Sequence, residues 1–121
     1  MSIANKTGGI VVMFEHRFYG ESKPKIDSSI IKKGNLAKYY APLTVENSLE
    51  DVVVFSKQFT HKNETLHPGK TPWIFVGGSY PGARGAWLRE RNPEIIYASL
   101  SGAAVVEVQR EFKDYYLAIE E

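Results

Sequence analysis

Short apolar runs separated by polar stretches divide the chain into alternating strand-like and helix-like segments. Three runs are rich in β-branched and aromatic residues and cover residues 10–14, 73–76 and 95–100. Such composition favours buried strands. Hydrophobicity that is continuous rather than alternating is typical of strands covered on both faces of a parallel sheet. The pattern therefore predicts an α/β fold with about three parallel strands and flanking helices.

The intervening segments supply the predicted helices. The first begins after Thr44, a suitable N-cap, and its apolar positions recur at helical spacing: Val45, Leu49, Val52, Val53, Ser56 and Phe59. A second helix starts at Ala83 and is stopped by Pro93. Residues 105–121 are amphipathic and predict a third helix. Residues 23–42 show no sustained period, so we expect a surface connection with at most one turn of helix.

A glycine-rich turn around one serine joins the second strand to the second helix. Ser79 stands among Gly77, Gly78 and Gly82, and it is followed by Tyr80. A serine in such a strand-to-helix turn has the form of a nucleophile elbow, which lifts the hydroxyl clear of the sheet and aims the next backbone N–H at a developing oxyanion. A tight turn in which the serine only caps the helix fits the same pattern.

A serine nucleophile needs a base to accept its proton, and the three histidines do not occupy the usual sequence position of that base. In the α/β-hydrolase order the histidine comes last, whereas His16, His61 and His67 all precede Ser79. Only His16 is predicted to lie at a strand end on the same sheet edge as the serine. Its charged neighbours favour a structural role instead. His61 and His67 are expected to be solvated, and the histidine spacing predicts no metal site.

Composition limits the classes of partner, metal site and compartment that fit this chain. The net charge is +1, from 15 basic and 14 acidic residues, which favours neither nucleic acid nor an anionic membrane surface as a partner. The chain has no cysteine, which excludes disulfides and thiolate metal sites. No apolar run is long enough to span a bilayer. The first residues lack the apolar core of a signal peptide, so the two N-x-[ST] sequons, at Asn5 and Asn63, matter only if the chain is secreted.

Two motifs together resemble one family. Residues 15–22 read Glu-His-Arg-Phe-Tyr-Gly-Glu-Ser, and residues 77–83 read Gly-Gly-Ser-Tyr-Pro-Gly-Ala. They are similar to the paired motifs of the serine peptidase family of lysosomal Pro-X carboxypeptidase, its dipeptidyl peptidase relatives and thymus-specific serine protease. Pro81 departs from the G-x-S-x-G form. The residues that carry the resemblance as structural motif are Glu15, His16, Arg17, Gly20, Glu21, Gly77, Gly78 and Gly82.

The resemblance implies a fragment of an α/β-hydrolase fold, with residues 1–110 as part of the hydrolase domain and residues 111–121 as the start of a helical insertion. It implies a proline-directed carboxypeptidase or dipeptidyl peptidase in which Ser79 forms the acyl-enzyme and the Tyr80 N–H binds the oxyanion. The substrate would be a peptide, no cofactor is implied, and the compartment would be secreted or lysosomal (vacuolar). The family's triad Asp and His have no counterpart in this chain, so we expect the chain alone to be inactive.

Two other interpretations stay open from the residues. Strands with open edges favour a non-catalytic fragment that binds a partner. Another α/β-hydrolase, such as an esterase, would share the serine turn but would not explain residues 15–22.

Overall fold

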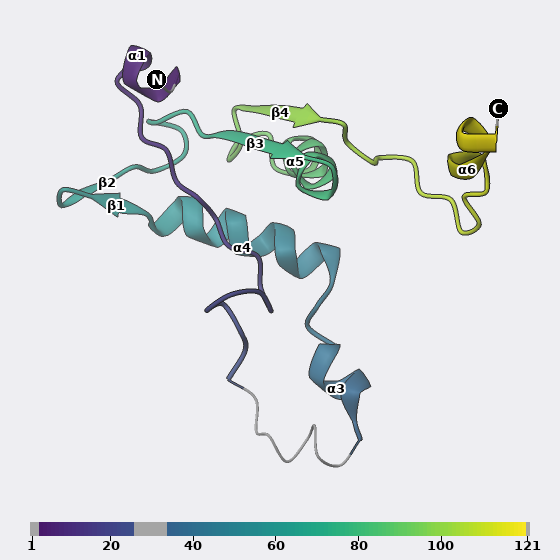
Figure 1. Cartoon of the computed structure of the whole chain (residues 1–121). Helices are drawn as coiled ribbons and strands as arrows, with labels where there is room; N and C mark the ends of the chain where they lie inside the picture. Colours follow the sequence, from purple (N-terminus) through teal and green to yellow (C-terminus); the bar gives the residue numbers. More distant parts are fainter. Residues whose placement is uncertain (1–2, 26–33, 121) are drawn as a thin grey trace. The chain divides into compact units, whose positions relative to one another are not determined.

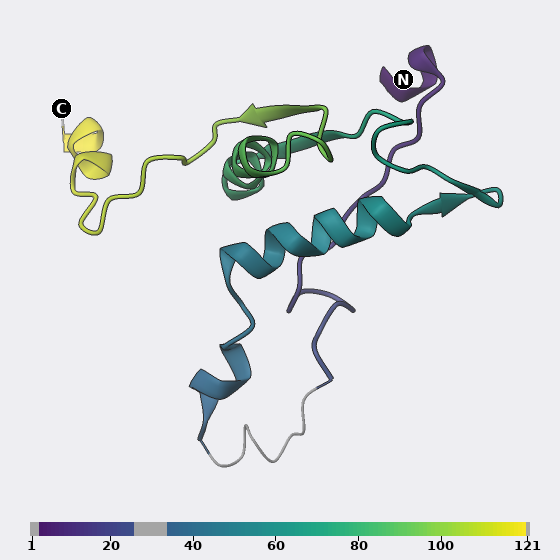
Figure 2. The same ribbon diagram turned by 180° about the vertical axis from the view of Figure 1, so that it is seen from behind.

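The structure is a computed structural model that describes residues 3–25 and 34–120. Its elements fall into two compact units, Met1–Phe55 and Ser56–Glu121, and each is described by itself. Figure 1 traces the chain from end to end and labels its elements, and Figure 2 gives the same ribbon from behind. Among the described helices, none combines the length and the apolar character needed to cross a membrane.

The first unit is helical where its secondary structure is regular. It contains α1 (Ile3–Thr7), α3 (Leu36–Tyr40) and most of α4 (Val45–Gln58), whose last turn belongs to the second unit. The predicted cap of α4 is confirmed, because Thr44 Oγ1 accepts a hydrogen bond from the Asn47 N–H at 3.1 Å. Leu49, Val52 and Val53 are buried on one stripe of the helix, as the apolar spacing predicts.

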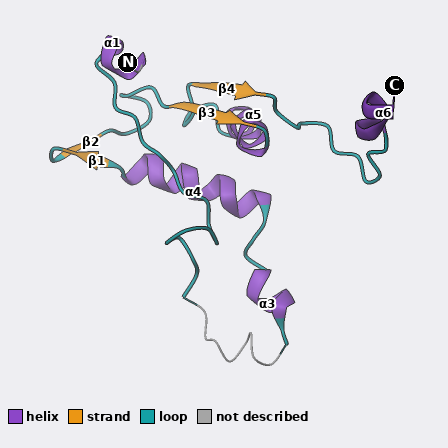
Figure 3. Cartoon of the chain, in the orientation of Figure 1, coloured by secondary structure: helices purple, strands orange, loops and turns teal. Residues whose placement is uncertain are grey.

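The second unit holds both sheets. A small hairpin pairs β1 (Thr60–His61) with β2 (Glu64–Thr65) in antiparallel fashion. The larger pair is parallel: β3 (Ile74–Gly78) lies beside β4 (Ala98–Gly102), in register from Ile74↔Ala98 to Gly78↔Gly102. The connecting helix α5 (Tyr80–Arg91) packs against both strands, as Figure 3 shows in orange and purple. This is the βαβ unit expected of an α/β fold.

The core of the second unit is formed by α5 and by the residues just before β4. Four apolar residues are buried there: Ala83, Leu88, Ile95 and Ile96. At the C-terminal end of α5 the Asn92 N–H donates to the Leu88 carbonyl at 2.9 Å. Pro93 follows at once, which agrees with the predicted stop. The opposite face of the pair carries exposed apolar side chains, with Ile74, Val76 and Leu100 each at least 60% exposed.

The predicted first strand is not formed. Residues 10–14 have no strand structure, and Met13 is 95% exposed. The parallel sheet of the described residues thus has two strands rather than three. The composition of the apolar run is typical of a strand. A strand forms only when its backbone is hydrogen-bonded to a neighbouring strand, however, and the side-chain pattern of one segment does not show whether that neighbour is present.

The predicted tail helix is shorter than expected, whereas the connection 23–42 agrees with the prediction in its described part. In the tail, only α6 (Asp114–Glu120) is helical, and the residues between 105 and 113 are irregular. Short amphipathic segments gain little helix without a surface to pack on, and Val108 and Phe112 are exposed. The connection 23–42 contains the single helical turn α3 as expected, while its residues 26–33 lie outside the described part of the chain.

Candidate functional site

The turn at Ser79 has an uncommon backbone conformation. Ser79 connects β3 to α5 with φ 57° and ψ −126°, a region that residues with a side chain seldom occupy. Such a conformation costs on the order of 1–3 kcal/mol and persists only when its surroundings hold it in place. The strain therefore has to be offset by specific contacts on both sides of the serine.

Backbone hydrogen bonds provide part of that support. The Ser79 N–H donates to the carbonyl oxygen of Gly102 at 2.9 Å, which ties the turn to the end of β4. The Ser79 carbonyl accepts from the Ala83 N–H at 3.0 Å, which starts α5. Because each bond uses one side of the same residue, the serine is held between the neighbouring strand and its own helix.

Glycines make the close approach of these elements possible. A Cβ on Gly77 would lie 2.4 Å from the backbone carbonyl of Pro81, and a Cβ on Gly82 would lie 2.8 Å from the Gly102 oxygen. Both clashes are with backbone atoms, which cannot rotate away. The third glycine differs, since a Cβ on Gly78 would meet nothing nearer than 3.9 Å. Gly77 and Gly82 are thus required by space, and Gly78 is not.

Ser79 is an exposed residue, and its hydroxyl does not cap the helix. Ser79 occupies the N-cap position of α5, yet its side chain makes no capping hydrogen bond. The capping interpretation of the sequence pattern is therefore wrong for this structure. Tyr80 is the first residue of α5, where backbone N–H groups point out along the helix axis, and Pro81 follows in the first turn.

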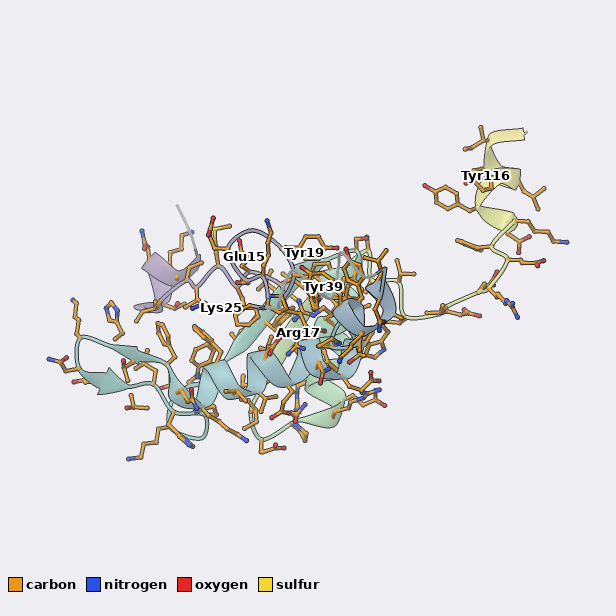
Figure 4. All side chains as sticks on the ribbon, turned by 90° about the horizontal axis from the view of Figure 1, so that it is seen from below. Glu15, Arg17, Tyr19, Lys25, Tyr39 and Tyr116 are labelled. Atoms are coloured by element: carbon orange, nitrogen blue, oxygen red, sulfur yellow. The ribbon has the colours of Figure 1, made fainter. Side chains whose placement is uncertain are left out.

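Residues 15–22 form an irregular loop built around one carboxylate. The Glu15 carboxylate accepts from the backbone N–H groups of Glu21 at 3.0 Å and Ser22 at 2.8 Å. The hydrogen bond from the Ser22 hydroxyl, together with these N–H groups, lowers the pKa of Glu15. Gly20, at φ 51°, passes so close that a Cβ there would overlap the Glu15 carboxylate. Figure 4 labels Glu15 and two other side chains of this loop.

Arg17 anchors the same loop to α4. Its Nε and Nη2 donate to the two carboxylate oxygens of Asp51, both at 2.6 Å, and Nη1 donates to the Pro42 carbonyl at 2.7 Å. The fork-to-fork geometry is the strong form of an arginine–carboxylate pair, and it raises the pKa of Arg17. Sequence reasoning missed Asp51, because no local spacing links two residues 34 positions apart.

Aromatic rings complete this arrangement. Phe18 packs on Tyr39 and Tyr40 of α3 with ring centroids 5.5 and 5.7 Å apart, and the His16 ring meets the Tyr19 ring edge-on at 5.5 Å. The Nδ1 atom of His16 lies 2.8 Å from the Arg17 carbonyl oxygen, a contact in which that nitrogen donates. These contacts fit a histidine that shapes the loop.

The two motifs thus lie in separate units, and one comparison with known proteins covers the residues of both. A sequence model of the family described as "Serine carboxypeptidase S28" matches residues 1–121. The chain belongs to this serine peptidase family.

Individual S28 relatives agree with that membership. A Caenorhabditis elegans protein named as serine protease K12H4.7 is 40% identical over 94% of the chain and 21% of its own length. Human lysosomal Pro-X carboxypeptidase is 34% identical over 86% of the chain and 20% of its own length. Human thymus-specific serine protease is 30% identical over 94% of the chain and 20% of its own length. The chain spans about a fifth of the length of these relatives.

The remaining sequence candidates of this S28 chain are two histidines and two sequons. His61 is exposed in β1, and the His67 ring contacts the Pro68 carbonyl. No group of three or more His, Cys, Asp or Glu side chains suited to a metal ion occurs among the described residues. The sequon at Asn5 lies in α1, and the sequon at Asn63 begins in the exposed hairpin turn, where Lys62 and Asn63 both have positive φ.

Proposed function

We propose that this chain is the nucleophile-bearing part of a serine exopeptidase that cleaves peptides next to proline, as a carboxypeptidase or a dipeptidyl peptidase. The observation that carries the proposal is the conformation of Ser79: an exposed residue in a strained strand-to-helix turn, whose hydroxyl does not cap the helix. The names of the S28 relatives supply the reaction class, since they are serine proteases and a Pro-X carboxypeptidase. An esterase is less well supported because the relatives compared are named as peptidases.

The chemistry follows from the atoms at the turn. Ser79 Oγ attacks the carbonyl carbon of the scissile peptide while its proton passes to a base, and the carbonyl oxygen becomes an oxyanion that accepts from the Tyr80 N–H. Collapse expels the amine and leaves an acyl-enzyme on Ser79, which water then hydrolyses. The base is the missing part, since no histidine follows Ser79 in these 121 residues.

Two assignments accompany this proposal. Residues 1–110 belong to the hydrolase domain, and residues 111–121 begin a helical insertion. The working compartment is secretory or lysosomal, which is supported by the name of the lysosomal relative and by the two sequons. Of the two, Asn63 stands at an exposed hairpin turn, a position where a glycan can extend into solvent.

The first test separates the nucleophile from its activation. We expect a fluorophosphonate probe to label the 121-residue chain no more than its Ser79→Ala variant, because the hydroxyl lacks a base. Peptide hydrolysis by this chain that Ser79→Ala abolishes would contradict its proposed inactivity.

The nucleophile itself is tested in a chimera in which residues 1–121 replace the matching segment of human lysosomal Pro-X carboxypeptidase. We expect labelling at Ser79, loss of labelling in Ser79→Ala, and retained labelling in the control Ser101→Ala, which alters a half-buried serine of β4. Labelling that survives Ser79→Ala would show that another residue is the nucleophile.

A second candidate function is a non-catalytic fragment that binds a partner. The exposed apolar face of the β3–β4 pair favours it, because exposed apolar patches mark interaction surfaces. A chain that remains monomeric at high concentration by analytical ultracentrifugation, and that unfolds cooperatively, would argue against self-association through this face.

A further inference from the structure

Arg84 is a buried, charged side chain in α5, the helix that follows the serine turn. It lies in the second turn of α5 and is only 4% exposed; among the described residues, no other ionisable side chain is buried to this degree. Placing a guanidinium group in the interior has a free-energy cost that its surroundings must offset. A residue of this kind therefore indicates a specific role for its contacts.

Two aromatic rings face the guanidinium group. Its Cζ atom lies 6.0 Å from the ring centroid of Phe75 in β3 and 6.0 Å from that of Tyr80, the first residue of α5. Arginine is suited to such a place, because its planar and weakly hydrated guanidinium stacks on aromatic faces. Arg84 thus connects the strand that precedes Ser79 with the residue that follows it.

The rest of α5 is fixed by other means. A Cβ on Gly85 would lie 2.4 Å from Ser99 Oγ and 2.8 Å from a Phe75 ring carbon, so the helix backbone lies directly against both strands. The Tyr80 ring is different, since it is 41% exposed and burial holds it only in part. The contact with Arg84 therefore adds to what holds the first residue of α5, next to the serine turn.

We propose that Arg84 is a positioning residue for the Ser79–Tyr80 turn: its guanidinium holds the Tyr80 ring and thereby fixes the direction of the Tyr80 backbone N–H. The proposed function enters this inference at one point only: it makes the Tyr80 N–H the oxyanion donor. The contact itself is a property of the 121-residue chain and can be measured without catalysis.

Amide hydrogen exchange followed by NMR tests the proposal in the full chain. The reporters are the N–H groups of Ser79 and Ala83, which bond to the carbonyls of Gly102 and Ser79. In Arg84→Met, which keeps the apolar stem, we expect both to exchange about tenfold faster, the effect of losing a desolvated cation–π contact. The Asn92 N–H, at the far end of α5, should change less than about twofold.

The conservative variant separates charge from packing. Arg84→Lys retains a cation over the rings, so the exchange of both reporters should return to within about threefold of the wild type. Unchanged exchange at Ser79 and Ala83 in Arg84→Met would overturn the proposal. Equal acceleration along all of α5 would overturn it as well, because that result describes a residue that only stabilises the helix.

A second measurement remains decisive if Arg84→Met does not fold. Protons of the Arg84 side chain that face aromatic rings resonate upfield, and Tyr80→Leu should move them partly back. Resonances that do not respond to Tyr80→Leu would refute the contact. Failure of Ser79 labelling in the chimera, with these signatures intact in the 121-residue chain, would refute the proposed function alone. Labelling of the chimera without these signatures would refute the role of Arg84 alone.

Discussion

The loop at residues 15–22 and the turn at residues 77–82 solve the same problem by different means. Each is an irregular segment with a precise shape, and each lies within the part of the chain that matches the S28 family. The loop is held by side chains, through the Glu15 carboxylate and the Arg17–Asp51 ion pair. The backbone of the turn is held by two hydrogen bonds and by the absence of Cβ atoms at Gly77 and Gly82, beside the contact that we propose for Arg84.

The difference determines how each segment responds to change. Side-chain contacts can be weakened in steps, by pH or by a conservative substitution, because flexible groups relax around the loss. Backbone atoms at a tight turn cannot rotate away from a clash, so one added methyl group displaces a whole peptide unit. The turn should therefore fail abruptly, and the loop gradually.

The largest effect should come from Gly77→Ala. The new methyl would meet the Pro81 carbonyl at 2.4 Å, and we expect a loss of about 3 kcal/mol in the free energy of unfolding of the second unit. Both tryptophans, Trp73 and Trp87, lie in that unit, so urea unfolding followed by their fluorescence reports on it.

Gly78→Ala is the matched control in the adjacent position, where the added methyl has room. Its effect should stay within about 0.5 kcal/mol. Equal losses for the two variants would show that the close approach at Gly77 does not hold the turn.

An intermediate effect is expected at the ion pair. Asp51→Asn and Arg17→Met should each lower the free energy of unfolding by about 1–2 kcal/mol, because the pair is bidentate but a quarter to a third of each side chain remains exposed. Circular dichroism of α4 is the measurement, since the first unit has no tryptophan.

The double variant sharpens this estimate. We expect a coupling free energy of about 1 kcal/mol between the two positions. Glu50→Gln, which alters an exposed neighbour on α4, should change the stability by less than about 0.5 kcal/mol. Strict additivity of Asp51→Asn and Arg17→Met would mean that the two groups stabilise the chain independently.

The smallest effect is a pH dependence at Glu15. Hydrogen bonds in the folded chain lower its pKa from the ordinary value of 4.5, so the ionised carboxylate contributes stability above that pH. The contribution is lost as the pH falls through the lower, folded-state pKa. The stability gap between the wild type and Glu15→Gln should thus be full at neutral pH and close in acid.

Chemical unfolding of the wild type and Glu15→Gln over a series of pH values measures this gap. Ser22→Ala removes the hydroxyl that bonds to Glu15 and should reduce it. A gap that stays constant down to acid pH would contradict the role of the charge.

Local pattern was enough for part of the fold. Four features are visible as patterns within a few residues: the cap at Thr44, the apolar stripe of α4, the stop at Pro93 and the order strand–turn–helix around Ser79. The missing strand at residues 10–14 and the short tail helix depend on surfaces that sequence periodicity does not describe.

The site was predictable to the same extent. The glycines around Ser79 were visible in the sequence as a motif. Their different roles were not, because only distances in the folded chain distinguish Gly77 from Gly78. Asp51 and Arg84 carried no signal at all. Each acts through a partner that is brought close by folding rather than by spacing along the chain.

The register of the parallel pair has one more consequence. The last paired residues of β3 and β4 are both glycines, Gly78 and Gly102, and the serine follows directly. At the level of this pair neither strand carries a side chain. Ser79 consequently follows a strand end where the two strands present only peptide groups, so their contribution beside the hydroxyl is the amide and carbonyl dipoles of the main chain.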